Sequence, residues 1–158
     1  MKLLPYDRFS LETTAPLEVV RERLASQVEP PKNLRWPSRN HLPYQGQVGE
    51  DGFTISRVLD YRNSFAPIIW GRFACSETGT IVQITMGLHS AVAVLLSLWL
   101  LFWYSMIIPV VLFTTMPTSV ALLFVGVPVV ALVIFSFAFW YEANRSRRDL
   151  TQIILEDY

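Results

Sequence analysis

Two charge-free apolar stretches dominate the sequence: residues 91–113, AVAVLLSLWLLFWYSMIIPVVLF, and residues 120–140, VALLFVGVPVVALVIFSFAFW. At a rise of 1.5 Å per residue, a helix of either length spans about 30 Å, the thickness of the hydrocarbon core of a bilayer. Backbone amides inside lipid need partners within their own segment, so both stretches should be helical despite their many β-branched residues. The sequence therefore predicts an integral membrane protein with two spans.

Each predicted span contains one proline, Pro109 in the first and Pro128 in the second. A proline removes one helical hydrogen bond and bends the helix. Either proline could mark a hinge or a cavity. We favour the simpler interpretation that membrane helices tolerate proline because neighbouring groups satisfy the freed backbone.

The orientation of the hairpin follows from the charges that flank it. The connection, residues 114–119 (TTMPTS), is short and uncharged, so the two helices should be antiparallel neighbours. Arg72 precedes the first span, and Arg145, Arg147 and Arg148 follow the second. The positive-inside rule places both termini in the cytoplasm and the turn on the outer, periplasmic or lumenal, side.

The composition of the chain agrees with a membrane protein. Its 158 residues are 52% hydrophobic, and 13 basic residues balance 13 acidic ones. No residue between Glu77 and Glu142 is formally charged, whereas a soluble domain of this size needs charged surface. The balanced charge argues against nucleic acid as a partner. Cys75 is the only cysteine, which excludes an internal disulfide, and residues 1–10 lack the apolar core of a secretory signal.

The polar residues before the hairpin predict a small domain of strands and one helix. Residues 14–18 predict a helix start, with the Thr14 hydroxyl as a candidate cap, and helical spacing of apolar residues continues the helix to about Gln27. Residues 29–47 contain four prolines and predict a mainly extended loop. Alternation and turn residues predict strands over residues 8–13, 53–61, 67–75 and 80–86, with a further short strand at 44–48.

The residues after the hairpin predict a helix that extends the second span into the cytoplasm and returns apolar surface to the sheet. Leu150, Ile153 and Ile154 form an apolar stripe, suited to covering a sheet. The predicted class is α+β: a small antiparallel sheet with one N-terminal and one C-terminal helix, interrupted by a two-helix transmembrane hairpin. The expected units are a cytosolic α+β domain (1–89), the hairpin (90–141) and a cytosolic amphipathic helix that packs on the domain (142–158).

Several short segments carry a resemblance to a known family. They are YRNSFAPIIWGRF at residues 61–73, Gly-Thr-Ile at 79–81, Leu-His at 88–89 and Glu-Ala-Asn at 142–144. Together they resemble a family of small uncharacterised bacterial membrane proteins, over most of the chain from about Gln47 onward. The resemblance implies a fold and a topology but no chemistry.

The order of the predicted elements suggests a more distant likeness. Strand, helix, antiparallel strands and C-terminal helix are similar to the helix-grip layout of START-like lipid-binding domains. Here the sheet is short, and the hairpin interrupts the layout before the last helix. The likeness concerns the fold only, because a fold does not by itself carry a function.

Two groups of residues are candidates for contacts with a partner protein. Trp99 and Trp103 lie one helical turn apart and share a face, which could pack on another membrane protein or a pigment, or meet lipid tails. Trp36 in the long loop, and Arg62 with Asn63 near a turn, could form a docking surface. The alternatives for Trp36 are a packing anchor or a contact with the membrane surface. For the polar pair they are local turn hydrogen bonds, or pairing of Arg62 with Asp60 or a lipid phosphate.

A third group could contact lipid or a cofactor. Candidates for anionic lipid headgroups are Arg57, Arg72, Arg145, Arg147 and Arg148. His89, at the start of the first span, could sense pH or ligate a pigment metal, or be an ordinary interfacial residue. Nucleophile-elbow, phosphate-loop, dinucleotide and zinc-protease motifs are missing, so no catalytic residue, metal site or cofactor is predicted.

These observations leave three hypotheses for the function. The leading one is a non-enzymatic accessory or assembly subunit of a larger bacterial membrane protein complex. The alternative is a membrane-anchored protein of START-like layout that binds lipid or another hydrophobic ligand, which requires an apolar cavity between sheet and helices. The third is a membrane enzyme whose catalytic residues the sequence does not pair, and a loss of activity on changing His89 would support it.

Overall fold

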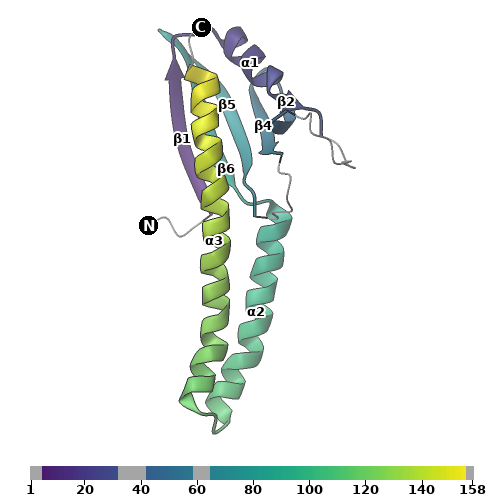
Figure 1. The fold of residues 1–158 in the computed structure, drawn as a ribbon, viewed down its shortest axis with the longest axis vertical. Coiled ribbons are helices and arrows are strands. Elements are labelled where there is room, and N and C mark those ends of the chain that lie inside the picture. The colour runs from purple at the N-terminus through teal and green to yellow at the C-terminus, as the bar shows by residue number, and fades with distance from the viewer. Residues whose placement is uncertain (1–4, 32–41, 59–64, 156–158) are drawn as a thin grey trace.

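The computed structural model describes residues 5–31, 42–58 and 65–155. It confirms the α+β class: a sheet lies at one end of the molecule, and two long helices extend from it (Figure 1). The elements in chain order are β1 (Tyr6–Thr13), α1 (Leu17–Ser26), β2 (Val28–Glu29), β3 (Tyr44–Val48), β4 (Gly52–Arg57), β5 (Ile68–Ser76), β6 (Gly79–Gly87), α2 (Ser90–Phe113) and α3 (Thr118–Leu155).

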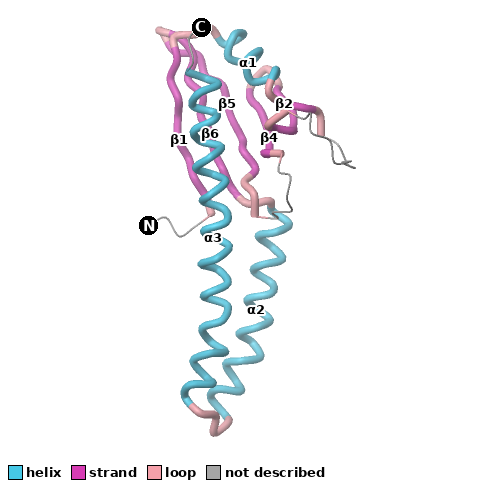
Figure 2. Tube along the Cα trace, viewed as in Figure 1, coloured by secondary structure: helices cyan, strands magenta, loops and turns pink. Residues whose placement is uncertain are grey.

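The sheet has six strands in the order β1-β6-β5-β4-β3-β2 (Figure 2). Its neighbours are antiparallel except for β2 and β3, which are parallel. The prediction of an antiparallel sheet is therefore wrong at this edge, and the sheet is mixed. The strand β2 was not predicted, because its two residues, Val28 and Glu29, leave no alternation in the sequence; Glu29 is the first residue of the segment predicted as a loop.

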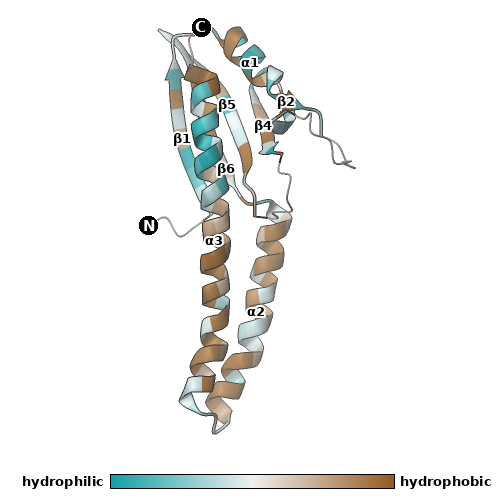
Figure 3. Cartoon of the chain, in the orientation of Figure 1, coloured by the Kyte–Doolittle hydropathy of each residue, from teal (hydrophilic) through white to brown (hydrophobic). Residues whose placement is uncertain are grey.

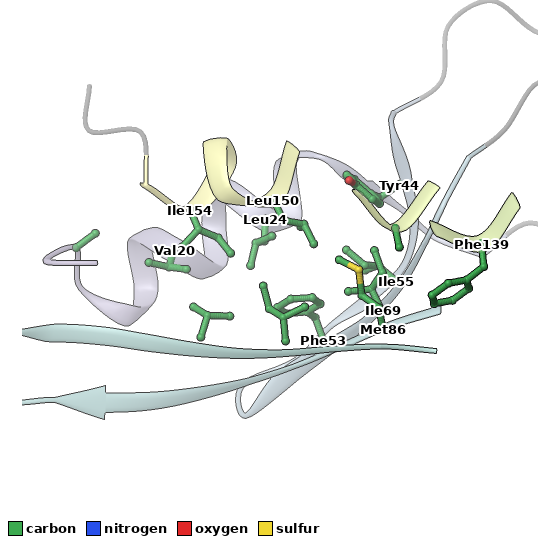
Figure 4. Close-up of a cluster of buried hydrophobic side chains, with 14 residues drawn as sticks. Val20, Leu24, Tyr44, Phe53, Ile55, Ile69, Met86, Phe139, Leu150 and Ile154 are labelled. Carbon is green, nitrogen blue, oxygen red and sulfur yellow. The ribbon is translucent and has the colours of Figure 1, made fainter. Parts of the chain in front are cut away.

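Alternating residues give the sheet two different faces. One face carries the apolar residues of the strands and is covered by α1 and by the C-terminal half of α3 (Figure 4). Val82, Ile84 and Met86 of β6 point to this face and are fully buried. Between the same strands, Phe53 lies opposite Gly71, and a Cβ at Gly71 would stand only 2.1 Å from the Phe53 ring. The glycine therefore makes room for the aromatic ring.

The helix α1 occupies the predicted residues but begins differently. Its N-cap is Pro16, and no side chain caps it, so the Thr14 cap prediction is wrong. The Thr13 hydroxyl instead accepts a hydrogen bond from the Ala15 amide at 3.3 Å. The buried Thr80 hydroxyl donates to the Ala15 carbonyl at 2.9 Å. These bonds fix the turn between β1 and α1 on the neighbouring strand β6.

The helix α3 is one continuous element of 38 residues, about 57 Å long at 1.5 Å per residue. It contains both the second predicted span and the predicted C-terminal helix. Figure 3 shows the change along it, from apolar residues beside α2 to polar residues beside the sheet. In its C-terminal half, Phe139, Ala143, Leu150 and Ile154 face the sheet and are buried in the core. One helix thus joins the hairpin to the α+β domain.

The helices α2 and α3 are each long and apolar enough to cross a membrane. They are antiparallel and joined by a turn at residues 114–117, two residues shorter than predicted. No residue of α2 is buried. His89 is the N-cap of α2, and its Nδ1 accepts a hydrogen bond from the Ala91 amide at 3.2 Å.

Candidate functional site

The contact between α2 and α3 is centred on two side chains of α2. The Trp103 indole Nε1 donates to the Phe124 carbonyl at 3.0 Å, and the Tyr104 hydroxyl donates to the Val125 carbonyl at 3.1 Å. Trp99 packs on Trp103 with ring centroids 5.7 Å apart. Trp103 therefore contributes to the contact between the two helices.

Pro128 explains why the Phe124 carbonyl accepts this bond. In an α-helix the carbonyl of residue 124 accepts from the amide of residue 128, and proline has no amide hydrogen. Pro128 is buried, so its freed carbonyl lies in an apolar environment where a missing partner is costly. The Trp103 indole supplies that partner from the opposite helix. The proline is thus tolerated by the mechanism that the sequence suggested.

This arrangement predicts that the effects of changing Trp103 and Pro128 depend on each other. Trp103→Phe keeps an aromatic ring but removes the donor, and should destabilise the hairpin by about 1–2 kcal/mol, as interhelical hydrogen bonds in membranes do. In a Pro128→Ala background the Phe124 carbonyl regains an amide partner, and the same change should cost less than half as much. Reversible unfolding in mixed micelles measures the four variants of this cycle. Equal costs in both backgrounds would contradict the assignment.

Two ion pairs fasten α3 to opposite parts of the sheet. Arg57 Nη1 on β4 lies 2.5 Å from Asp149 Oδ2 on α3. Arg147 Nη1 on α3 lies 3.5 Å from Asp7 Oδ2 on β1, and its guanidinium stands over the Phe9 ring at 4.5 Å. Asp7 is 3% exposed, so its pair is shielded from water on that side. We call these two pairs the α3 clamp.

Three buried polar residues, Tyr44 of β3 and Glu142 and Ser146 of α3, lie in the interior of the domain. Tyr44 is 1% exposed, and the Arg57 guanidinium lies 5.8 Å from its ring centroid. Glu142 and Ser146 lie one turn apart on α3 and are fully buried. Burial, together with the charge of Asp149, raises the pKa of Tyr44 to about 12, although Arg57 and the hydroxyl of Ser146 act in the opposite direction. The neutral phenol is therefore strongly favoured in the folded protein.

The raised pKa of Tyr44 predicts a loss of stability at alkaline pH. A group whose pKa is higher in the folded than in the unfolded state stabilises the fold fully below the unfolded value, about 10 for tyrosine. That contribution disappears as the pH rises through the folded value of about 12. Thermal unfolding followed from about pH 9 to about pH 12 crosses the ordinary tyrosine pKa of about 10. Over this range the melting temperature of the native chain should fall more steeply than that of Tyr44→Phe. Parallel curves would contradict it.

The headgroup candidates among the arginines fall into two classes. Arg57 and Arg147 belong to the α3 clamp, and the side chain of Arg57 is only 10% exposed, so it is occupied within the domain. Arg145 and Arg148 are exposed on α3, and Arg72 is exposed on β5. Trp36, Arg62 and Asn63 lie outside the described residues. Within the described ranges, no group of three or more His, Cys, Asp or Glu residues is placed to hold a metal ion.

The face of the sheet opposite the helices is open, and we call it the open face. A broad concavity of about 1130 Å³ lies along it. The residues of the open face that line this concavity are polar, basic or aromatic and come from five strands. They are Arg8, Gln47, Thr54, Trp70, Arg72, Gln83 and Thr85. The end of α1 and the residues around β2 complete the rim.

A stacked pair of rings links the segment before β5 to α3. The Phe65 and Phe135 centroids are 4.2 Å apart, with an interplanar angle of 15°. Phe135 lies in the apolar half of α3, so the domain contacts the hairpin directly as well as through the helix itself.

The comparisons with known proteins return nothing: no protein-family model, no curated protein and no solved structure matches this chain.

Proposed function

We propose that this chain is a non-enzymatic accessory or assembly subunit of a larger bacterial membrane protein complex. In this proposal α2 and the apolar half of α3 cross the membrane as a hairpin. Both termini lie in the cytoplasm, and the turn at residues 114–117 lies on the outer side.

The helix lengths and the distribution of charge support the membrane crossing. Both helices have the length and composition for it, and their apolar side chains are mostly exposed in the isolated chain. The basic residues Arg145, Arg147 and Arg148 follow the apolar half of α3, whereas the turn carries no charge. This asymmetry favours a cytoplasmic α+β domain.

The observation that carries the proposal is the continuity of α3. A single helix forms half of the hairpin and then enters the core of the α+β domain, where the α3 clamp holds it from both sides. The apolar hairpin surface and the open face are thus connected through one continuous helix. A small subunit that contacts a complex both in and beside the membrane needs this arrangement.

The interior of the domain favours this proposal over the alternative of a START-like ligand carrier. A carrier needs an apolar cavity between its sheet and its helices. In the described residues that space is filled by one continuous cluster, which includes Leu24, Ile69 and Leu150 at 0–1% exposure (Figure 4). The large concavity lies along the open face instead.

Site-specific photo-cross-linking in native membranes tests the proposal. A photoreactive residue at Phe102, which is 66% exposed on α2, should give cross-links to another membrane protein in a stable complex that survives mild detergent. The same residue at the adjacent Trp103, which faces α3, is the control and should cross-link only within the chain. Purification as a monomer or homodimer, with lipid adducts alone at position 102, would contradict the proposal.

A further inference from the structure

We infer that the open face is a docking surface for the headgroups of anionic phospholipids in the leaflet where α2 begins. This inference rests on the membrane crossing proposed above, but it does not depend on a protein partner. It concerns the half of the open face nearest to the hairpin. This half is formed by the first residues of β1 and β5 and the last residues of β6.

The position of this half follows from the strand register. The strand β6 ends at Gly87, three residues before Ser90, where α2 begins. Tyr6 and Ile68 lie opposite Gly87 on the two neighbouring strands. These residues therefore form the row of the open face closest to the proposed membrane. The next row, with Arg8, Thr85 and Trp70, is two residues away, about 7 Å at 3.3 Å per residue. That distance is comparable to the depth of the headgroup layer.

Two exposed aromatic residues occupy this position. Trp70 is 39% exposed, and Tyr6 is 54% exposed. A Cβ at Gly87 would lie 3.2 Å from the Trp70 ring and 3.9 Å from the Tyr6 ring, so both rings flank this glycine above the start of α2. Tryptophan and tyrosine are enriched at the interface between membrane and water, because their rings are apolar and their tips are polar.

The charges on the same face match an anionic headgroup. Arg8 and Arg72 are exposed and line the concavity, and among the described residues that line it the one acidic residue is Asp51, in the β3–β4 turn. The register places Arg8 in the row of Trp70 and Arg72 one row farther from the hairpin. A long arginine side chain can reach back toward a phosphate while its stem lies on the sheet. The side chains of Thr54, Gln83 and Thr85 also line the concavity and provide further hydrogen-bond donors.

Lipid retention tests the inference on the full chain. The probe is a nanodisc of equal parts phosphatidylglycerol and phosphatidylcholine with identical acyl chains, and the lipids that stay bound after release are counted by native mass spectrometry. The native chain should retain phosphatidylglycerol in preference to phosphatidylcholine. Arg8→Gln and Arg72→Gln should each lower this preference by about fivefold, the effect expected for one basic residue at an anionic surface.

Two variants serve as controls. Arg72→Lys keeps the charge and should keep most of the preference, which separates headgroup binding from misfolding. Arg21→Gln removes an arginine from α1, where it pairs with Glu18, and should leave the preference unchanged. An unchanged preference in both Arg8→Gln and Arg72→Gln, or no preference in the native chain, would overturn the inference. Loss of all lipid of both kinds would instead contradict the membrane crossing on which it rests.

Discussion

Replacing Leu150 by alanine is expected to lower the free energy of unfolding of the α+β domain by about 2–5 kcal/mol, the usual cost of truncating a buried leucine. Leu150 is 0% exposed and lies among the core residues contributed by α1 and the sheet (Figure 4). The truncation leaves a cavity where α3 covers the sheet, so α3 loses part of its attachment to the domain. Thermal unfolding in detergent, followed by circular dichroism, measures the effect.

Leu155 provides the matched control for this change. It is the same residue type on the same helix but is 41% exposed. Leu155→Ala should therefore change the stability by less than about 1 kcal/mol, because little apolar surface is lost from the core. Equal losses for the two variants would show that the C-terminal half of α3 is not seated on the sheet.

Breaking the α3 clamp at Arg57 is the second change with a large expected effect. Arg57→Leu removes the partner of Asp149 and the cation above the Tyr44 ring. Breaking a fully buried pair costs about 3–5 kcal/mol, but Asp149 is 35% exposed, so solvent reduces the expected loss to about 2 kcal/mol. Arg57→Leu combined with Asp149→Leu should recover part of it, because no unpaired carboxylate remains. Chemical denaturation of the four variants measures the coupling.

The pair of Arg21 and Glu18 is the control for the clamp. Its atoms are 2.6 Å apart, similar to the Arg57 pair, but its side chains are 35% and 71% exposed on α1. Arg21→Leu should change the stability by no more than about 0.5 kcal/mol, as exposed helical pairs do. If both arginine changes cost the same, the clamp has no special role in holding α3.

Local sequence patterns predicted most of the elements because their periods are strong. The alternation in β5 and β6 and the apolar runs placed both ends of β5, β6 and α2, and the start of α3, within about two residues of the observed positions. Local patterns could not predict the parallel pairing of β2 with β3, because Val28 and Glu29 pair with residues that lie fifteen or more positions farther along the chain. The continuity of α3 through Tyr141 was also predicted, because the residues after the second span carry a helical pattern that follows it without a break.

The sites were harder to predict, because each joins residues that are distant in sequence. The pairing of Arg57 with Asp149 crosses the whole hairpin and has no local signal. Trp103 was selected as an unusual residue, but its role depends on the Phe124 carbonyl. The hydrogen bond from Trp103 could have been inferred from the sequence. Pro128 leaves the Phe124 carbonyl without its helical partner, and a short turn between antiparallel helices brings this part of α3 beside Trp103. Of the open face, only Arg72 was selected from the sequence, as a headgroup candidate, because Arg8 and Trp70 look like ordinary exposed strand residues.

The native Cys75 allows a direct test of the hairpin and its orientation. It is the only cysteine in the chain, is exposed, and lies on β5 in the α+β domain. With a membrane-impermeant maleimide applied to bacterial spheroplasts, Cys75 should stay unlabelled until the membrane is permeabilised. Thr115→Cys in a Cys75→Ser background, in the turn, should be labelled before permeabilisation. Labelling of Cys75 in sealed spheroplasts, or protection of the turn, would contradict a two-span hairpin with a cytoplasmic domain.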